Sequence, residues 1–361
     1  MEETDRLSNL PHPIIHHILS LMDTRYVVHT SLLSKEWRYH WVHIHSLNFD
    51  FTTFINFTSF KNFVLNILQH RKPSTLIGLR FHLNGMRSAH LVRKISSYAL
   101  SHGVEELETN AIIANTFPAR LFECLKTLKL GSCTIQSFPD SPFGHFLSLT
   151  TLQLYKVLFS YYITSNVNDD DNNSLFLSFP NLENLSLIKC LVSDSKMSFN
   201  ISHPRLVHLA ISCLEFRGLW LVVSAPSLKI LNLNGTHPLV FVMNKRQTLE
   251  KVHINLFLPP VSREIKHHKQ SYISYLNRMA RGLCYSKSLR VSLAFSKGKF
   301  LLYRQNSDHD AEMIFEELKE TEEDWLSFAL PMVRGFGLNQ LTTILEEILF
   351  GGTFSETMNQ V

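Results

Sequence analysis

The sequence predicts an α/β protein with three parts in order: a small helical segment, a long array of short parallel strands, and a helical C-terminal end. Three observations support this prediction. Apolar residues recur at helical spacing over residues 5–41, a leucine pattern recurs from position 76 onward, and helical spacing returns near the C-terminus. We place the boundaries so that the parts span residues 1–45, 46–300 and 301–361.

Composition limits the class of protein. Of 361 residues, 45% are hydrophobic and 18% are charged, which predicts a substantial core and excludes global disorder. The five cysteines are an odd number and form no C-x-x-C pair, so we expect neither a disulfide framework nor a zinc site. Residues 1–5 lack the basic and then apolar run of a secretory signal, and the apolar runs are too short to span a membrane. We expect a reducing compartment, in the cytoplasm, the nucleus or both.

The helical segment carries more apolar residues than it can hide. A unit of about 40 residues rarely builds a sufficient core alone, and surplus apolar surface usually marks a partner site. Pro13 suits the first turn of a helix, and Ser34 can cap a helix that contains Trp37. The segment is therefore predicted to be a docking element. Its apolar residues at helical spacing are Leu10, Ile14, Ile15, Ile18, Leu19, Leu21, Met22, Val27, Val28, Leu32, Leu33, Trp37 and Trp41.

A repeat runs through the middle of the chain. The copy Leu125-Leu128-Leu130-Cys133-Ile135 fits the pattern L-x-x-L-x-L-x-x-N/C-x-L, and related copies start at positions 76, 104, 149, 182, 206, 228 and 249. Most intervals between copies fall within the roughly 20–29 residues of leucine-rich repeats. Each copy predicts a short strand and a turn, and stacked copies bury one continuous core. Cys133 and Cys190 occupy the ninth place of the pattern, so we expect structural roles for them.

Other elements are expected around the repeats. An edge strand is predicted at residues 47–51, and a later strand at residues 289–295. Amphipathic helices are predicted at residues 59–69 and 88–100, on the convex side of the array. The longest interval between copies contains a polar insertion at residues 166–173, which reads as a loop.

Charge is unevenly distributed near the C-terminus. A helix is predicted at residues 263–285, and ten Lys and Arg residues face one acidic residue between positions 263 and 304. From Asp308 onward, twelve acidic residues face two basic ones. We predict that residues 308–324 form an amphipathic helix that caps the array, followed by a last helix at 338–350. Two alternatives stay open: the basic surface binds a polyanion, or the acidic segment is an interaction tail.

The helical segment resembles the F-box motif, most closely that of plant F-box proteins with leucine-rich repeats. The resemblance rests on Leu10-Pro11, on the isoleucines and leucines of residues 14–19, on residues 30–38 and on Trp41, in order and without gaps. It departs from the family where His12-Pro13 and Tyr26 replace common acidic residues. The resemblance implies that the following residues bind an adaptor: Leu10, Pro11, Ile14, Ile15, Ile18, Leu19, Leu32, Ser34, Trp37 and Trp41. Alternatively, Trp37 and Trp41 only pack the helices together.

The resemblance also implies a function. F-box proteins bind a Skp-type adaptor, and through it a cullin, while the repeats hold a target protein for ubiquitin transfer. We therefore expect a non-enzymatic target-recognition subunit of an SCF-type (Skp–cullin–F-box) ubiquitin ligase, with an unidentified target. The alternative is an adaptor-bound scaffold without a degradative outcome, or a small-molecule sensor.

The sequence offers no other chemistry. It contains no Gly-rich phosphate loop, no G-x-S-x-G and no H-E-x-x-H, so we expect no catalytic residues and no cofactor. His40, His43 and His45 cluster without a further ligand, so we expect no metal site. We expect neither nucleic acid nor membrane as a partner.

Overall fold

The structure is a computed structural model, and the chain divides into two compact units. The first unit contains residues 1–159 and 178–182, and the second contains residues 160–177 and 183–361. Each unit is described by itself. The described residues are 10–71, 75–111, 119–135, 146–159, 176, 179–192, 198–213, 215–216, 220–235, 249–257, 279–281, 283, 285–295, 298–305, 311–316 and 334.

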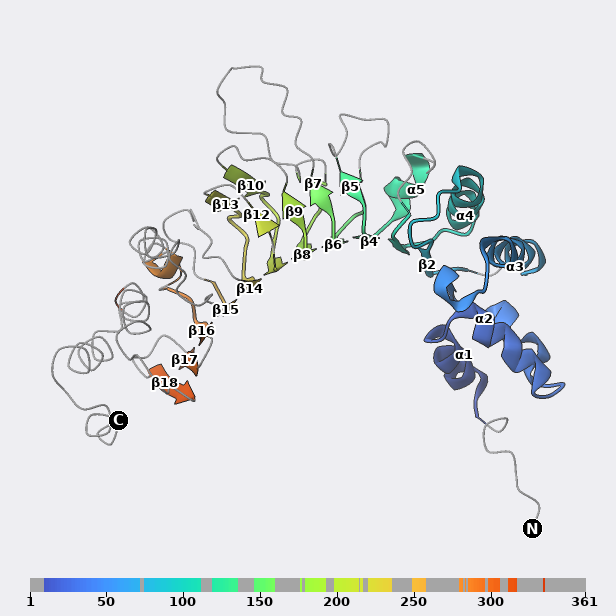
Figure 1. The fold of residues 1–361 in the computed structure, drawn as a ribbon, viewed down its shortest axis with the longest axis horizontal. Coiled ribbons are helices and arrows are strands. Elements are labelled where there is room, and N and C mark those ends of the chain that lie inside the picture. Colours follow the sequence, from blue (N-terminus) through green and yellow to red (C-terminus); the bar gives the residue numbers. More distant parts are fainter. Residues whose placement is uncertain are drawn as a thin grey trace, which may run out of the picture. The chain divides into compact units, whose positions relative to one another are not determined.

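The first unit begins with a bundle of short helices (Figure 1). The bundle consists of α1 (His12–Ser20), α2 (Thr24–His29) and the 3-10 helices η1 (Thr30–Leu32) and η2 (Trp37–His43). Local chemistry fixes the helix starts: Pro13 lies in the first turn of α1, and Asp23 caps α2 by accepting a hydrogen bond from Arg25 N at 2.8 Å. The Ser34 hydroxyl accepts a hydrogen bond from Trp37 N at 3.3 Å, which agrees with its predicted capping role.

The bundle is tied to the first strand of the sheet. Strand β1 (Ser46–Asp50) donates a hydrogen bond from Asn48 N to Thr24 Oγ1 at 2.8 Å and another from Asp50 N to Asp23 Oδ2 at 3.2 Å. The Ser46 hydroxyl donates to Ser20 O at 3.2 Å. Edge strands expose unpaired backbone groups, and here α2 covers them. The helical bundle therefore closes the first edge of this sheet.

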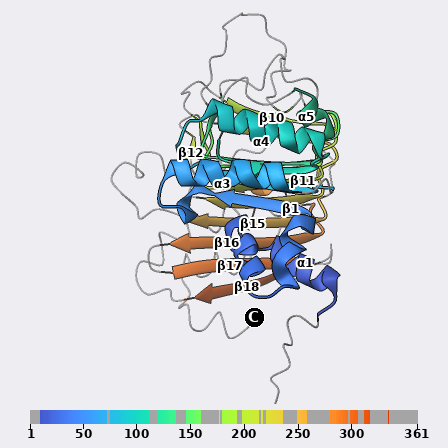
Figure 2. The same cartoon turned by 90° about the vertical axis from the view of Figure 1, so that its right-hand side faces the viewer.

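Parallel strands form the sheet of the first unit, in the order β1, β2 (Gly78–His82), β3 (Glu106–Thr109), β4 (Thr127–Gly131) and β6 (Thr151–Tyr155). The helices α3 (Phe57–His70), α4 (Ala89–Ser101) and α5 (Ala119–Cys124) lie along one side of it (Figures 1 and 2). A short 3-10 helix, η3 (Phe51–Thr53), follows β1. The predicted edge strand and both predicted helices are confirmed within two residues.

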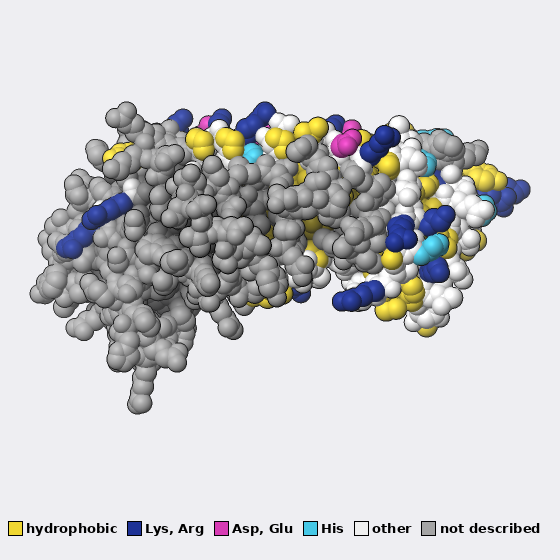
Figure 3. Space-filling view, turned by 90° about the horizontal axis from the view of Figure 1, so that it is seen from above, with side chains coloured by type: hydrophobic (Ala, Val, Ile, Leu, Met, Phe, Trp, Pro, Cys, Tyr) yellow, Lys and Arg dark blue, Asp and Glu magenta, His cyan; other side chains and the backbone are white. Residues whose placement is uncertain are grey.

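The outer, helical side of the first unit faces water. Scattered Lys, Arg and His side chains lie there among neutral ones (Figure 3). Asn56 caps α3 by accepting a hydrogen bond from Ser59 N at 2.9 Å, and Ser88 caps α4 by accepting one from Leu91 N at 3.4 Å. The apolar faces of these helices cover the sheet, since Phe60, Val64 and Ile95 are fully buried.

The core of each unit is a ladder of apolar residues in strand register. The ladder residues of the first unit are Leu47, Leu79, Leu107, Leu128 and Leu152, and those of the second unit are Leu185, Leu209, Leu231, Val252 and Leu289. Each is at most 2% exposed. Burial of such a side chain contributes about 1.5–3 kcal/mol, so the repeat pattern predicted from the sequence marks the core directly.

A left-handed residue follows several strands at the same repeat position. Ser132 and Lys156 in the first unit, and Lys189 and Cys213 in the second, have φ angles of 49°, 51°, 52° and 50°. Non-glycine residues adopt this conformation at a cost. Hydrogen bonds to the end of the next strand offset the cost, as from Ser132 N to Tyr155 O (2.8 Å) and from Cys213 N to Asn234 O (2.6 Å). The chain then turns into a second, two-residue strand.

The two-residue strands pair in parallel within each unit. In the first unit β5 (Thr134–Ile135) pairs with β7 (Leu158–Phe159), and in the second β9 (Leu191–Val192) pairs with β12 (Glu215–Phe216). Cys190 lies between β8 and β9, is buried, and donates from Sγ to Ile188 O at 3.6 Å. Its expected structural role is confirmed, and Cys133 is half-buried at the equivalent place.

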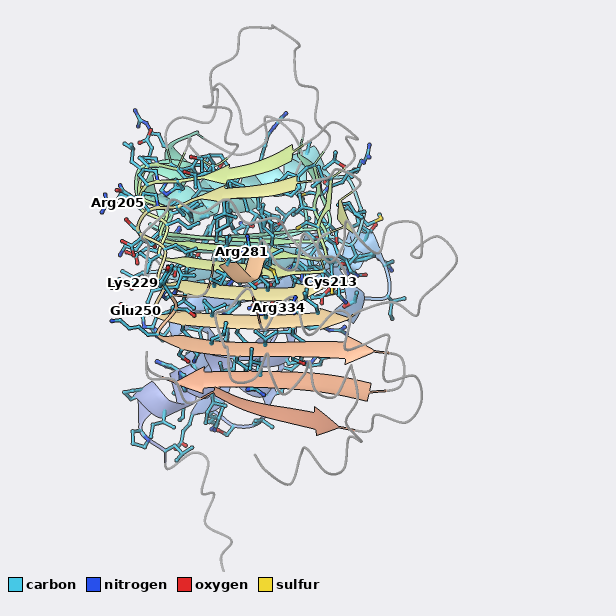
Figure 4. All side chains as sticks on the ribbon, turned by 90° about the vertical axis from the view of Figure 1, so that its left-hand side faces the viewer. Arg205, Cys213, Lys229, Glu250, Arg281 and Arg334 are labelled. Carbon is cyan, nitrogen blue, oxygen red and sulfur yellow. The ribbon has the colours of Figure 1, made fainter. Side chains whose placement is uncertain are left out.

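The second unit continues the parallel pattern. Its main sheet contains β8 (Asn184–Ile188), β11 (His208–Ser212), β14 (Ile230–Gly235), β15 (Lys251–Phe257) and β16 (Ser288–Phe295). A separate pair joins β10 (Ser198–Ser202) and β13 (Trp220–Ser224). Figure 4 shows Arg205, Lys229 and Glu250 at the edge where these strands begin and Cys213 at the opposite edge. Lys229 Nζ lies 3.3 Å from Glu250 Oε1.

The end of this sheet differs from the prediction. Strand β17 (Gly298–Gln305) pairs antiparallel with β16, and strand β18 (Ala311–Glu316) pairs antiparallel with β17. The prediction of a helix over residues 308–324 is therefore wrong at residues 311–316, which form a strand. The array does not pass directly into a helical end. A connection of five residues allows an antiparallel hairpin, and its backbone pairing outweighs the near-helical spacing of the apolar residues.

Several predicted features fall largely outside the described residues. They are the polar insertion at 166–173, most of the helix at 263–285, and the last helix at 338–350. Residues 279–281 and 283 of the predicted helix 263–285 are helical. Among the described residues, no helix is long and apolar enough to cross a membrane.

Candidate functional site

Helix α1 presents apolar residues on two neighbouring stripes, about 100° apart around the helix axis. Ile15 and Leu19 are each 1% exposed and form the core of the helical bundle. Ile14 and Ile18 are 47% and 39% exposed, and their spacing of four residues places them on one outer stripe. Leu21, one turn further, is 75% exposed. The outer stripe therefore leaves much of its apolar surface exposed, where a partner can cover it.

A second exposed apolar site ends η1. Leu32 is 85% exposed and Leu33 is 70% exposed, on a turn that Ser34 then caps. Large apolar side chains so exposed on a small bundle are typical of an interaction surface. We call Ile14, Ile18, Leu21, Leu32 and Leu33 the exposed apolar set.

The structure divides the ten predicted adaptor-binding residues. Ile15, Leu19 and Trp37 are buried within this chain, so we remove them from the proposed contact residues. Trp37 is 7% exposed and packs edge to face against His40, with ring centroids 5.7 Å apart. Its burial favours the alternative that it packs the helices together. The exposed members are Pro11, Ile14, Ile18 and Leu32, and the half-buried members are Leu10, Ser34 and Trp41.

Four histidines gather where α1 meets η2. His16 Nε2 lies 3.3 Å from His40 Nδ1, and the rings of His12 and His43 lie 5.0 Å from His40 and 6.2 Å from His16. Burial, followed by the charges of neighbouring histidines, lowers the pKa of both His16 and His40. We call these four residues the histidine cluster.

The histidine cluster lines an open depression of about 540 Å³, together with Glu36, Trp37 and Tyr39. Among the described residues, no group of three or more His, Cys, Asp or Glu side chains could hold a metal ion. The sequence grouped His40 and His43 with His45 and marked His12 only as a departure from the F-box pattern, so it did not predict this cluster. The spacing of four residues between His12 and His16 places them on one face of α1, but only the packing of α1 on η2 brings the two pairs together.

Comparison with known proteins agrees with this architecture. A family model of the F-box domain matches residues 7–48, which cover the helical bundle and the start of β1. The chain is 30% identical over 249 residues to an F-box/LRR-repeat protein of Arabidopsis thaliana, an alignment that covers 64% of this chain and 75% of that protein.

Two further relatives come from the same organism. An FBD-associated F-box protein is 28% identical over 290 residues, covering 78% of this chain and 65% of that protein. An F-box/FBD/LRR-repeat protein is 30% identical over 240 residues, covering 64% of this chain and 50% of that protein. The chain thus spans between half and two thirds of the length of these two relatives.

A helical docking bundle joined to an array of leucine-rich strands defines a class of binding proteins. The chain belongs to the F-box/LRR-repeat family. The resemblance and the fold class predicted from the sequence are confirmed, apart from the strand pairing at the end of the second unit.

Proposed function

We propose that this chain is the target-recognition subunit of an SCF-type ubiquitin ligase. The observation that supports the proposal most strongly is the exposed apolar set on the F-box. These side chains leave large apolar areas exposed, while Ile15, Leu19 and Val27 fill the core of the bundle. Their exposure has a physical explanation if a Skp-type adaptor covers them and links the chain to a cullin.

The adaptor contact that we propose is narrower than the one expected from the sequence. Pro11, Ile14, Ile18 and Leu32 provide it, with Leu21 and Leu33 added on the ground of their exposure. Leu10, Ser34 and Trp41 lie at its rim. A few buried anchor residues usually supply most of the binding free energy of an interface, so two or three of these side chains should dominate.

The repeats are proposed to hold the target protein. The hydrogen bonds from β1 to Thr24 and Asp23 join the F-box firmly to the first strand. A target on the strand face of the first unit would then keep a fixed orientation to the adaptor. Held in this way, a target lysine reaches a high effective concentration near the conjugating enzyme, and other subunits perform the transfer. This role suits the cytoplasm and the nucleus.

A pair of exposed-residue variants tests the adaptor contact. The double variant Ile14→Asp with Leu32→Asp places two charges in the proposed apolar interface. We expect loss of co-purification with a Skp adaptor, at least about 30-fold in Kd or roughly 2 kcal/mol, because burying an unpaired carboxylate in an apolar interface is costly. Binding is measured by calorimetry on the full chain.

The matched control is Ile55→Asp, which changes an isoleucine that is 97% exposed in the same unit but outside the bundle. It should bind the adaptor as the unaltered chain does. Unchanged adaptor affinity in the double variant would contradict the proposed contact. Accumulation of ubiquitinated proteins in cells that express the chain separates a ligase subunit from a non-degradative scaffold.

A further inference from the structure

The strand face of the second unit, opposite to its buried ladder, carries basic side chains. Alternate residues of a strand point to opposite faces, so the residues between the ladder positions lie on this face. Among the described residues of β8, β11, β14, β15 and β16, these positions hold Lys251, Arg290, His208 and His253 but no Asp or Glu. Lys251, Arg290 and His208 are exposed, and His253 is half-buried.

The strand register brings three of these groups together. His253 and Arg290 are Cα partners on β15 and β16, and Lys251 precedes His253 by two residues on the same face of β15. By strand dimensions, the Cα atoms of Lys251 and Arg290 lie about 8 Å apart. Burial, followed by the charges of Arg290 and Lys251, lowers the pKa of His253, which agrees with their proximity. We call Lys251, His253 and Arg290 the basic triplet.

The acidic residues nearby do not balance both cations of the basic triplet. Glu250 lies at the edge where β15 begins, and its Oε1 is 3.3 Å from Lys229 Nζ. Glu312 of β18 is in register with Arg290 across β17, so two strand spacings, roughly 10 Å, separate their backbones. One carboxylate at that place offsets at most the charge of Arg290. The charge of Lys251 then has no carboxylate opposite it among the described residues of this face.

The strand face of the first unit differs in charge. There the register aligns Asn48, Arg80, Glu108 and Lys129 in one row. Glu108 Oε2 lies 2.9 Å from Arg80 Nε and 3.9 Å from Lys129 Nζ, and Glu106 adds a second carboxylate on the same strand. The cations of the first face are therefore balanced, whereas those of the second face favour a negatively charged partner.

Amide side chains border the basic triplet. Asn232 is the Cα partner of His253, and Asn234 and Asn255 are partners of each other in the next row. Asn232 and Asn234 are exposed, and Asn255 is half-buried. An amide side chain both donates and accepts hydrogen bonds, as a peptide group does. These side chains can therefore pair with the backbone of an extended segment.

We propose that the strand face of the second unit binds an extended acidic segment of the target protein. Carboxylates on alternate residues of such a segment lie about 7 Å apart, close to the separation of Lys251 and Arg290, so each cation binds one of them. The amides of Asn232 and Asn234 pair with the backbone of the segment. The inference rests on the proposed function, because it names the chemistry by which the repeats hold the target.

Three labelled ligands test the proposal on the full chain. The first is a pool of hexapeptides with glutamate fixed at two alternate positions, and the second has glutamine at the same positions. The other positions are uncharged, and both ends are blocked. The third ligand is a six-nucleotide thymidylate strand, which represents nucleic acid. Binding is followed by fluorescence anisotropy.

We expect the acidic pool to bind at least about tenfold more tightly than the neutral pool, and more tightly than the nucleic acid. Equal binding of the two peptide pools, or binding of neither, overturns the proposal. Tighter binding of the thymidylate strand also overturns it, because the partner of this face would then be a nucleic acid.

The pH dependence of binding gives a second readout. Bound carboxylates favour the protonated form of His253, so affinity for the acidic pool should rise as the pH falls from about 8 to about 6. The glutamates stay ionised in this range, since their ordinary pKa is about 4.3. His253→Gln should remove the rise, whereas His208→Gln, two strands from Lys251, should retain it. An affinity of the unaltered chain that does not change with pH contradicts the proposed site.

Charge variants locate the contact. Lys251→Gln and Arg290→Gln should each weaken binding of the acidic pool by about fivefold or more. The matched control is Lys126→Gln, which removes an exposed cation that pairs with Glu105 at 2.8 Å in the first unit. It should leave binding within about twofold. If Arg290→Gln fails to fold, Lys251→Gln still decides, and unchanged binding in that variant contradicts the proposal.

Adaptor binding by the same proteins separates this proposal from the proposed function. The unaltered chain and Lys251→Gln should bind a Skp adaptor equally. Absence of a preference for the acidic pool with adaptor binding intact refutes the peptide site alone. Failure of the unaltered chain to bind any Skp adaptor refutes the ligase role instead.

Discussion

The F-box bundle and the strand ladder of the first unit use the same apolar residue types for opposite purposes. Each ladder leucine from Leu47 to Leu152 is at most 2% exposed, whereas α1 buries Ile15 and Leu19 but exposes Ile14 and Ile18. A strand of period two directs its leucines to one face, which the helices cover. A helix with apolar residues on two stripes can bury only one of them here. The comparison teaches that apolar character alone does not separate core from interface.

The largest effect should come from a ladder leucine compared with an exposed one. Leu152→Ala empties a fully buried position and should lower the free energy of unfolding by about 2–5 kcal/mol. Leu32→Ala, at a position 85% exposed, should change stability by less than about 0.5 kcal/mol but weaken adaptor binding. Urea unfolding and adaptor titration measure the two effects. Similar stability losses in both variants would abolish the distinction between the two regions.

An intermediate effect is expected at the joint between the two regions. Thr24→Val keeps the shape of a side chain that is 1% exposed but removes the acceptor for Asn48 N. The unpaired amide should cost about 1–3 kcal/mol and should exchange its hydrogen faster. The exchange rate of the Asn48 amide hydrogen measures this effect. The control is Thr53→Val, which changes a half-buried threonine that does not bond to Asn48. An unchanged exchange rate would show that the bundle is not tied to β1 through Thr24.

The smallest effect should be a dependence of bundle stability on pH. Burial and neighbouring histidines lower the pKa of His16 and His40 below the ordinary value of 6.5, although Glu36 acts in the opposite direction on His40. The unfolded chain therefore binds more protons than the folded one. The stability that these two histidines contribute by staying neutral is fully present above about pH 6.5 and is lost as the pH falls below that value.

Thermal unfolding at about pH 7.5 and 5.5 tests this dependence. His16→Gln should reduce the acid-induced fall in melting temperature, whereas His90→Gln, at an exposed position on α4, should leave it unchanged. The effect is small because His16 is only half-buried, so water screens its interactions. The ladder should show no comparable response, which sharpens the contrast between the two regions. If the melting temperature of the His16→Gln variant fell with acid as much as that of the unaltered chain, the proposed role of the histidine cluster would be contradicted.

The sequence predicted the ladder well because its signal is local and repeated. Each copy places its leucines at fixed spacing, so β4, β6, β8 and β11 could be located from the pattern alone. The left-handed residues could not be located in this way. Ser132, Lys156, Lys189 and Cys213 are not residues that favour positive φ, and the hydrogen bonds that hold them come from neighbouring strands.

The site was predicted only in part, for a related reason. The F-box motif identified the bundle, but it listed Ile15, Leu19 and Trp37 beside residues that face solvent. The strand at 311–316 was missed because its pairing partner in β17 was not evident from helical spacing. The alignment of Asn48, Arg80, Glu108 and Lys129 across β1–β4 was not anticipated either, since it depends on strand register across four copies.

By itself, the sequence determined the family, the order of the parts and the residues of the repeat core, because each of these depends on spacing along the chain. Tertiary structure alone decided which apolar residues of the F-box remain outside, how four histidines meet, and which polar groups share a row. Those properties depend on distances between segments far apart in the chain. Packing and hydrogen bonding set these distances, and local spacing does not record them.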